Sequence, residues 1–398
     1  MKIVFLAPFG IRPKGTVFAR MLPLAVELKA IGHEVVIVSP PYTNPEDSGR
    51  EETVRGVRVT NVRLFRGNKA LGALVLSWRL LAAALSEKPD LIHLFKPKGY
   101  AGLAAMLLLI LKGIGMRLPP LFLDSDDWEG RGGMNDLAPY SGTEKRLFGF
   151  QERFLPGRST GVSVASRTLQ SQMWGLGVSP ERLLYLPNCV EETPRGDGGP
   201  LRSRLGIEAG APVLLLYTRF FEFDQEKLAL IFEMVHSRVA GVRFLVVGKG
   251  RNAEEQRLLA QGRERGFDRA LVMAGWVEPD LLPDYLAVGD LAIYPFADTL
   301  VNRAKCPAKL TELLNAGVPV VADRVGQISE YIGPGTGVLC DPDDWPEMAQ
   351  AAAELLLSPL ERRALGEAGR RYLLERFKWK QFAQKLDFFY KKRMGFTR

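Results

Sequence analysis

Apolar residues along the first half of the chain fall alternately into short continuous runs and into helically spaced sets. The stretch KIVFLAP is uninterrupted, as in a strand that is buried on both faces. It is followed by GTVFARMLPLAVELKAIG, whose apolar residues have helical spacing and which stops at Gly32. Further apolar runs recur after it: HEVVIVSP, VRVTNVRLF, DLIHLF, PLFLDSDD and GVSVAS. This alternation predicts a parallel sheet covered by helices, with right-handed crossovers.

The pattern lapses into Pro, Gly and charged residues in NCVEETPRGDGGPLRSRLG and then restarts with PVLLLYT, VRFLVVG, ALVMAG, LAIYPF, VPVVAD and TGVLCD. We therefore expect an α/β protein with two doubly wound, Rossmann-like domains that face one another across a cleft. The predicted boundaries are 1–190 for the first domain, 191–206 for a linker and 207–377 for the second. The aromatic, amphipathic segment 378–396 is expected to form a helix that packs back onto the first domain.

Chain length bears on the number of domains, and net charge bears on the kind of partner that the protein binds. A chain of 398 residues is long enough for two domains with separate cores. Its net charge of +8 favours acidic partners such as phosphorylated metabolites or anionic lipid. Residues 41–120 contain 12 Lys or Arg and 6 Asp or Glu, which makes this region locally basic. Nucleic acid is disfavoured because the basic residues are dispersed among acids, with no patch interleaved with aromatic residues.

The numbers of cysteines and histidines, the N-terminus and the longest apolar run bear on metal sites and on the location of the protein in the cell. Three cysteines without paired spacing favour a reducing compartment and argue against disulfides or a zinc site. Three histidines are too few for a multi-histidine metal centre. The N-terminus lacks the pattern of a cleavable signal peptide. The run AGLAAMLLLILKGIG is interrupted by Lys112 and too short to span about 30 Å of hydrocarbon. A buried helix is favoured there, with contact to a membrane surface as the alternative, so the expected location is cytoplasmic, including the inner face of the cell membrane.

Ligands of open parallel sheets bind beyond the carboxyl ends of the strands, so the exit loops hold the candidate residues. The first loop carries Gly15 at the start of a helix, where N–H groups can meet an anion, but it lacks the GxGxxG pattern. His93 ends another strand and could act as a base, bond a sugar hydroxyl or be a structural histidine. In DSDDWEGRGG, Asp126 and Asp127 are candidates for binding hydroxyls or accepting a proton.

Exit loops of the second half supply further candidates. Arg219 follows the first strand and matches phosphate oxygens with its planar fork. Lys227 comes eight positions later and could be a ligand of the same phosphates or a solvated surface lysine. Gly248 ends the next strand in VVGKG, and the MAGWV stretch offers backbone groups and an apolar wall to a planar base through Trp276 and Val277.

The stretch NRAKCPAKLTELLNAGVPVVA runs from a loop into a helix that begins near Pro307 and returns at once into a strand. First-turn N–H groups up to Leu310 can bind a diphosphate, with Lys305 and Lys309 adding positive charge. Glu312, one turn into the helix, is placed to accept hydrogen bonds from a ribose. The tight NAGVPVVA return favours this role over that of a solvated carboxylate.

Together these segments resemble the retaining glycosyltransferases of the GT-B fold, specifically the large GT4 family. The resemblance covers nearly the whole chain and is most specific in KLTELLNAGVPVVADRVGQISEYI, TRFFEF, FLVVGKG and GWV. It implies that Glu312 binds the donor ribose and that Arg219 neutralises the leaving diphosphate. Three departures stand out: Ala304 occupies the position of the family's first glutamate, the spacing from Arg219 to Lys227 is longer than usual, and LDSDD stands where many relatives have a histidine.

The expected activity is transfer of a sugar from a nucleotide-diphosphate sugar to a hydroxyl of a lipid, glycan or small molecule, with no cofactor and no metal. Arg219 would stabilise the leaving group, and His93, Asp126 or Asp127 would orient the acceptor hydroxyl. Two alternatives stay open: a nucleotide-sugar-binding subunit that has lost activity, which Ala304 keeps in view, and a nucleotide-sugar epimerase. An NAD enzyme is disfavoured by the missing GxGxxG motif.

Overall fold

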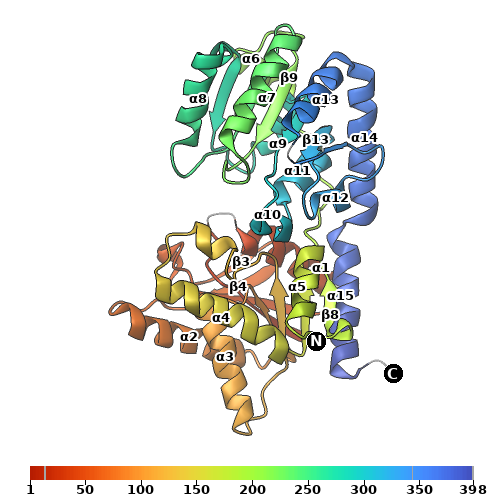
Figure 1. The fold of residues 1–398 in the computed structure, drawn as a ribbon. Coiled ribbons are helices and arrows are strands. Elements are labelled where there is room, and N and C mark those ends of the chain that lie inside the picture. Colours follow the sequence, from red (N-terminus) through yellow and green to blue (C-terminus); the bar gives the residue numbers. More distant parts are fainter. Residues whose placement is uncertain (13–14, 343, 397–398) are drawn as a thin grey trace. The chain divides into compact units, whose positions relative to one another are not determined.

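The computed structural model describes residues 1–12, 15–342 and 344–396, which form two compact units (Figure 1). Unit 1 consists of Met1–Cys189, Ala304–Cys306 and the described part of Trp379–Arg398. Unit 2 consists of Val190–Arg303 and Pro307–Lys378, less residue 343.

Unit 1 is built on an eight-stranded sheet with the order β3-β4-β2-β1-β5-β6-β7-β8. All neighbouring strands are parallel except β3 and β4, which pair antiparallel. The central strands are continuous apolar runs because helices cover both faces. The strands are β1 (Lys2–Leu6), β2 (Glu34–Ser39), β3 (Glu51–Val54), β4 (Val57–Asn61), β5 (Leu91–Phe95), β6 (Leu121–Ser125), β7 (Gly161–Val164) and β8 (Leu183–Tyr185).

Helices of unit 1 begin with a π-helical turn, Val17–Met21, that continues into α1 (Leu22–Ala30). The last helix of the chain, α15 (Trp379–Met394), packs against α1 within this unit, and its Asp387 lies 2.8 Å from His33. Short 3₁₀ turns occur at Pro45–Asp47, Met134–Leu137 and Pro180–Arg182. The remaining helices are α2 (Lys69–Ser86), α3 (Gly99–Gly113), α4 (Gly142–Arg158) and α5 (Arg167–Gly175).

Unit 2 has a six-stranded, fully parallel sheet with the order β11-β10-β9-β12-β13-β14. Its strands are β9 (Val213–Tyr217), β10 (Arg243–Val247), β11 (Leu271–Gly275), β12 (Leu291–Tyr294), β13 (Val320–Asp323) and β14 (Val338–Cys340). Its helices are α6 (Gly198–Arg204), α7 (Gln225–Arg238), α8 (Glu254–Arg265), α9 (Leu282–Val288), α10 (Leu300–Ala304), α11 (Ala308–Ala316), α12 (Ile328–Tyr331), α13 (Trp345–Leu357) and α14 (Pro359–Arg376), with a 3₁₀ turn at Asp268–Ala270.

Each sheet has one point at which the strand order changes direction. In unit 1 the chain moves from β1 to β2 on one side and reaches β5 on the other, and in unit 2 the same occurs around β9, with β10 on one side and β12 on the other. Ligands of such sheets bind at the carboxyl ends of the strands beside this switch point. The exit loops of β1 and β5, and those of β9 and β12, are therefore the places to examine.

The predicted α/β class with two parallel Rossmann-like sheets is confirmed, and all six strands expected in the second half form. β3 and β8 are additions that the sequence pattern did not indicate, because both are short and their side chains are at most half-buried. Within the segment 191–206 the structure has one helix, α6, which packs on α9. No helix among the described residues is long and apolar enough to cross a membrane.

Candidate functional site

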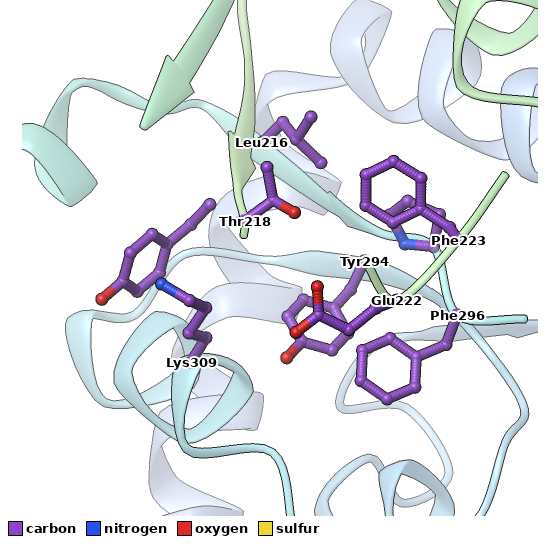
Figure 2. Close-up of a pocket in the computed structure, with 9 residues that line it drawn as sticks. Leu216, Thr218, Glu222, Phe223, Tyr294, Phe296 and Lys309 are labelled. Carbon is purple, nitrogen blue, oxygen red and sulfur yellow. The ribbon is translucent and has the colours of Figure 1, made fainter. Parts of the chain in front are cut away.

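A small pocket lies at the switch point of unit 2 (Figure 2). Its walls come from the end of β9, the loop after β9, the end of β12 and the first turn of α11. Figure 2 shows the carboxylate of Glu222 between the rings of Phe223 and Phe296 and the side chain of Lys309. The lining residues are Leu216, Tyr217, Thr218, Glu222, Phe223, Tyr294, Pro295, Phe296 and Lys309.

Glu312 lies beside this pocket, one turn into α11. Its Oε2 atom accepts a hydrogen bond from the Tyr217 hydroxyl at 2.9 Å, which joins the helix to the end of β9. Burial, together with the negative charge of Glu312, raises the pKa of Tyr217 well above its ordinary value, so the tyrosine remains the donor. The Lys309 ammonium lies 3.5 Å from the centre of the Tyr217 ring. Lys309 and Glu312, two of the polar groups expected near a nucleotide, are thus brought together around Tyr217 at the end of β9.

The NAGVP return fixes α11 in place. Asn315 donates to the backbone oxygen of Glu191 at 2.9 Å and to the Thr193 hydroxyl at 3.0 Å. Gly317 ends the helix with φ of +78°, a conformation that glycine adopts without the steric cost of a side chain. A Cβ atom at Gly366 would lie 2.3 Å from the Gly317 oxygen, so α14 approaches this turn closely. The C-terminal end of α11 is therefore anchored by these contacts.

Arg219 leaves β9 at the switch point with an exposed side chain, and its guanidinium lies 4.9 Å from the centre of the Phe221 ring. Gly248, which follows β10, has φ of +122°, and a Cβ atom there would lie 1.8 Å from the Thr218 oxygen. Its N–H donates to the Gly275 oxygen at 2.7 Å. Glycine at position 248 thus lets the loops after three neighbouring strands approach one another.

Lys227 has a different partner from the phosphates that the sequence suggested. Its ammonium lies 2.9 and 3.0 Å from the two carboxylate oxygens of the fully buried Asp323 and also bonds the Pro342 oxygen. The same Asp323 accepts the Phe296 N–H at 2.7 Å. Because leaving Asp323 buried without this cation would be costly, Lys227 stabilises the sheet edge, and we do not retain it as a donor ligand.

Trp276 and Val277 follow β11, the outermost strand of the sheet, and neither lines the pocket. Trp276 is 55% exposed. Of the nine residues that line the pocket, only Lys309 was singled out from the sequence; Glu222, Tyr294 and Phe296 are among those that were missed. They could have been found from the same exit-loop rule, because FFEF follows β9 and YPF ends β12.

Ala304 and Lys305 group with unit 1, not with the rest of their helical segment. The Ser166 hydroxyl donates to the Ala304 oxygen at 2.7 Å, and the Asn188 side chain donates to the Cys306 oxygen at 2.7 Å. Ala304 is completely buried, so the position of the family's first glutamate is a packing position in this chain. Lys305 is also buried and does not line the unit 2 pocket.

At the switch point of unit 1, the exit loops of β5 and β6 form a buried cluster of charges. The Lys96 ammonium lies 3.0 Å from Asp126 and 3.5 Å from Glu129, and it also bonds Asp127. The loop after β1 joins the cluster, because the hydroxyl of Thr16, next to Gly15, donates to Asp126 at 3.2 Å. Asp126 and Asp127, predicted from sequence, are therefore neighbours at the place where a ligand is expected.

His93 does not reach this cluster. It lies inside β5, completely buried, with Phe5 and Phe122 packed against its ring and the Tyr390 hydroxyl bonded to Nδ1. Burial lowers the pKa of His93 to about 4, so the ring is neutral at pH 7. The sequence placed His93 at the end of the strand, but the structure makes it a core residue without access to an acceptor hydroxyl.

Among the described residues, no group of three or more His, Cys, Asp or Glu side chains is arranged to hold a metal ion. The carboxylates of unit 1 instead surround Lys96 and Lys98, and Lys98 lies 2.9 Å from Glu129. Beneath them Arg20 makes a bidentate pair with Asp124, with both contacts at 2.7 Å. Lys96, Lys98 and Arg20 thus supply positive charge at this site.

Two family models match the chain. The model described as glycosyl transferase 4-like domain matches residues 15–189, and the model described as glycosyl transferases group 1 matches residues 211–358. Among curated relatives, the chain is 28% identical to the MMP alpha-(1->4)-mannosyltransferase of Mycolicibacterium hassiacum over 62% of this chain and 58% of that protein. It is also 28% identical to the GDP-mannose-dependent alpha-(1-6)-phosphatidylinositol monomannoside mannosyltransferase of Mycobacterium tuberculosis, over 57% of this chain and 60% of that protein. The match thus spans about three fifths of the length of these relatives.

Solved structures share the whole fold. Sucrose-phosphate synthase from Thermosynechococcus elongatus superposes with a TM-score of 0.76 at 18% identity, covering 100% of both chains. Anabaena HepE in complex with UDP and glucose superposes with a TM-score of 0.74 at 18% identity, covering 97% of this chain and 98% of that one. With both family models matched in order and the fold shared along its length, the chain belongs to the group 1, GT4-like glycosyltransferases of the GT-B fold.

Proposed function

We propose that the protein is a retaining glycosyltransferase that moves a sugar from a nucleotide-diphosphate sugar to a hydroxyl of a lipid, glycan or small-molecule acceptor. The observation that carries the proposal is the pocket at the switch point of unit 2, lined by Lys309 in the first turn of α11 and by Tyr217, which is hydrogen-bonded to Glu312. Its donor ligands would be Arg219, Lys309, the N–H groups near Leu310, Glu312, and the loops at Gly248 and Trp276. Relatives named as GDP-mannose-dependent and a neighbour that binds UDP and glucose support a nucleotide-sugar donor.

In this mechanism the positive charges of Arg219 and Lys309 and the N-terminus of α11 stabilise the diphosphate as it leaves. The acceptor oxygen forms a bond to the anomeric carbon on the face that the diphosphate leaves. The bond from that carbon to the diphosphate oxygen breaks, and its electron pair goes to the diphosphate. The hydroxyl proton passes to a carboxylate of unit 1, and from there to solvent.

The test is a thermal-shift screen of the full chain against nucleoside diphosphates and nucleotide sugars, starting with GDP-mannose and UDP-glucose. A ligand at 100 times its Kd raises the free energy of unfolding by about 2.7 kcal/mol, which is a clear shift in Tm. The stabilising donor is then assayed for transfer and for slow hydrolysis. Binding without either reaction would replace the transferase by a nucleotide-sugar-binding protein, and no shift with any nucleotide would overturn the proposal.

We further propose that unit 1 contacts an anionic membrane surface through α2, which together with α3 lies on the outside of this unit (Figure 1). Leu71, Leu74 and Trp78 repeat at helical spacing and are 53%, 60% and 57% exposed. Arg63 and Arg66, in the loop before the helix, are exposed. An apolar helical stripe with a tryptophan and neighbouring arginines complements the boundary between lipid tails and anionic headgroups.

Vesicle flotation checks the membrane proposal. The protein should bind vesicles that contain phosphatidylglycerol but not pure phosphatidylcholine, and Leu74→Ser with Trp78→Ser should abolish binding. Trp174→Ser, which changes an exposed tryptophan on α5, is the matched control. Equal binding by the α2 variant would refute this surface.

The three cysteines are buried free thiols, which supports a location in the reducing cytoplasm.

A further inference from the structure

Two arginines of unit 2 share one aromatic ring. The guanidinium carbon of Arg219 lies 4.9 Å from the centre of the Phe221 ring, and that of Arg251 lies 5.8 Å from the same centre. Arg219 follows β9, and Arg251 lies in the loop after β10, the strand that pairs with β9 next to the switch point. Both arginines are exposed. Positive charge from two exit loops therefore gathers at the edge of the sheet where ligands bind.

The backbone after β9 fixes the directions in which Arg219 and Phe221 leave the sheet. Phe220, between them, has φ of +67° and is only 2% exposed, so a buried ring holds a conformation that is unfavourable for residues other than glycine. The Phe220 N–H donates to the Thr218 hydroxyl at 2.8 Å. Thr218 is in turn tied to β10, because its N–H donates to the Val247 oxygen at 2.9 Å. The residues on either side of Phe220 thus leave from a well-fixed turn.

The loop after β10 is held by the two carboxylates that follow it. The Gly250 N–H donates to Glu255 at 2.7 Å, and the Asn252 N–H donates to Glu254 at 2.5 Å. Both glutamates belong to the first turn of α8, which begins directly after the loop. The carboxylates nearest to Arg251 in the sequence therefore bond the backbone on either side of it, and neither forms an ion pair with its guanidinium.

The charges of the two arginines are not balanced by the chain. Among residues 1–12, 15–342 and 344–396, neither Arg219 nor Arg251 lies within ion-pairing distance of a carboxylate. Two cations at one ring repel each other, although solvent screens this repulsion while the site is open to water. A bound anion would replace the repulsion by attraction, and the planar guanidinium matches phosphate oxygens in a bidentate manner. The arrangement thus favours an anion that offers oxygens to both arginines.

The proposed donor site also lacks one cation that the sequence suggested. Lys227 was a candidate for the phosphates, but its ammonium is bonded to the buried Asp323. Arg251 is free of such a partner among the described residues, and it faces the same ring as Arg219, to which the proposed function assigns the diphosphate. Arg251 is therefore placed to supply the second positive charge.

We propose that Arg251 is a phosphate-binding residue, which together with Arg219 holds the diphosphate of the donor and stabilises it as it leaves. The inference rests on the proposed function and deepens it, because it assigns part of the leaving-group site to the loop after β10. The bonds that form and break are those of the proposed transfer. When the bond from the anomeric carbon to the diphosphate oxygen breaks, its electron pair stays on that oxygen, and both guanidiniums stabilise the added negative charge. Phe221 positions the two arginines.

The experiment measures the Kd of GDP and of UDP by isothermal titration calorimetry, for the full chain and for Arg251→Ala. Loss of a hydrogen bond to a charged group should weaken binding of the nucleotide that the protein accepts by about tenfold, the lower end of the usual range, because the arginine is exposed to solvent. Arg251→Lys keeps the charge but lacks the planar guanidinium, so its loss of affinity should be smaller. Lys249→Ala is the matched control, since Lys249 is an exposed cation of the same loop, and its Kd should change less than about threefold.

Inorganic pyrophosphate shows which part of the nucleotide Arg251 contacts. Pyrophosphate should compete with the nucleoside diphosphate, and its competition should weaken in Arg251→Ala by a factor similar to that of the nucleotide. Equal competition in both proteins, with weaker nucleotide binding in the variant, would place Arg251 at the base or the ribose and overturn the proposal. The donor kcat/KM should fall by at least the same factor as the affinity, because the charge on the diphosphate grows in the transition state.

The possible results distinguish this inference from the proposed function. Because Arg251 is exposed, Arg251→Ala should keep the wild-type Tm, so that a weaker Kd reports on the contact itself. Unchanged nucleotide affinity in Arg251→Ala, or an equal loss in Lys249→Ala, would overturn the role of Arg251 while leaving the transferase intact. A wild type that binds nucleoside diphosphate with the predicted Arg251 dependence but transfers no sugar would refute the proposed function and support the phosphate contact. A wild type that binds neither GDP nor UDP would refute both.

Discussion

At the switch point of unit 2, aromatic rings and Lys309 line a small pocket, whereas at the switch point of unit 1 Lys96 and Lys98 are in direct contact with three carboxylates. Both places arise in the same way, from exit loops on either side of a change in strand order. One leaves a small pocket beside Lys309, and the other is filled by its own ion pairs. The same architecture thus produces two different electrostatic environments.

This difference separates the effects that variants should have. In unit 2, side chains would contact the donor directly, so their loss should appear in nucleotide affinity or in stabilisation of the leaving group. In unit 1, each charge is held by several others, so the loss of one changes the ionisation of its neighbours before it changes binding. The predictions that follow test this contrast, from the largest expected effect to the smallest.

Arg219→Ala should lower kcat by about 10²- to 10³-fold, the cost that removal of one preorganised donor has at other sites of developing charge. The reason is that the arginine fork would face the diphosphate, whose charge grows in the transition state. Arg219→Lys keeps a positive charge but lacks the planar guanidinium, so its kcat should lie between those of the wild type and Arg219→Ala. Steady-state kinetics with saturating donor give kcat for the wild type and for both variants. An unchanged kcat in Arg219→Ala would remove this residue from the mechanism and weaken the contrast between the units.

Glu312→Ala should weaken binding of the nucleoside diphosphate by about 1.5–3 kcal/mol, or about 10- to 150-fold, because a charged hydrogen-bond acceptor for the ribose is lost. Tyr217→Phe is the matched control, since it removes only the hydrogen bond to Glu312 and should cost less than about 1 kcal/mol. Isothermal titration calorimetry gives both values. Nucleotides that lack the 2′- or the 3′-hydroxyl identify which hydroxyl Glu312 contacts. Removal of the contacted hydroxyl should weaken binding to the wild type but should cost little further affinity in Glu312→Ala. Wild-type affinity in Glu312→Ala would refute the ribose contact.

The sequence could predict which loops matter but not which partners their side chains choose. Continuous apolar runs located β9 to β14, of which β9, β10, β12 and β13 are largely buried, while β3 and β8 are short, contain no buried residue and were missed. The exit-loop rule led to Glu312, Asp126 and Asp127 as candidates, and their roles stay predictions. It could not show that Lys227 pairs with Asp323, 96 positions away, because such a contact depends on packing between distant segments. For the same reason the position of Lys96 among three carboxylates emerges only from the folded chain.

His93→Gln should have the smallest effect on catalysis, because the sequence offered His93 as a base but the structure buries it in the core of unit 1. Its pKa is about 4 when folded, through burial, and about 6.5 when unfolded. Between these values the unfolded chain binds more protons, so the free energy of unfolding falls by about 1.4 kcal/mol per pH unit as the pH drops from 6.5 toward 4. His93→Gln lacks this loss, so the stability advantage of the wild type over the variant should shrink between pH 7 and pH 5 in urea denaturation. At pH 7 the variant should keep kcat within about tenfold, since the ring would position Tyr390 and touch no substrate. A folded His93→Gln protein without transfer activity would indicate that His93 takes part in the reaction, and it would refute a purely structural role for this histidine.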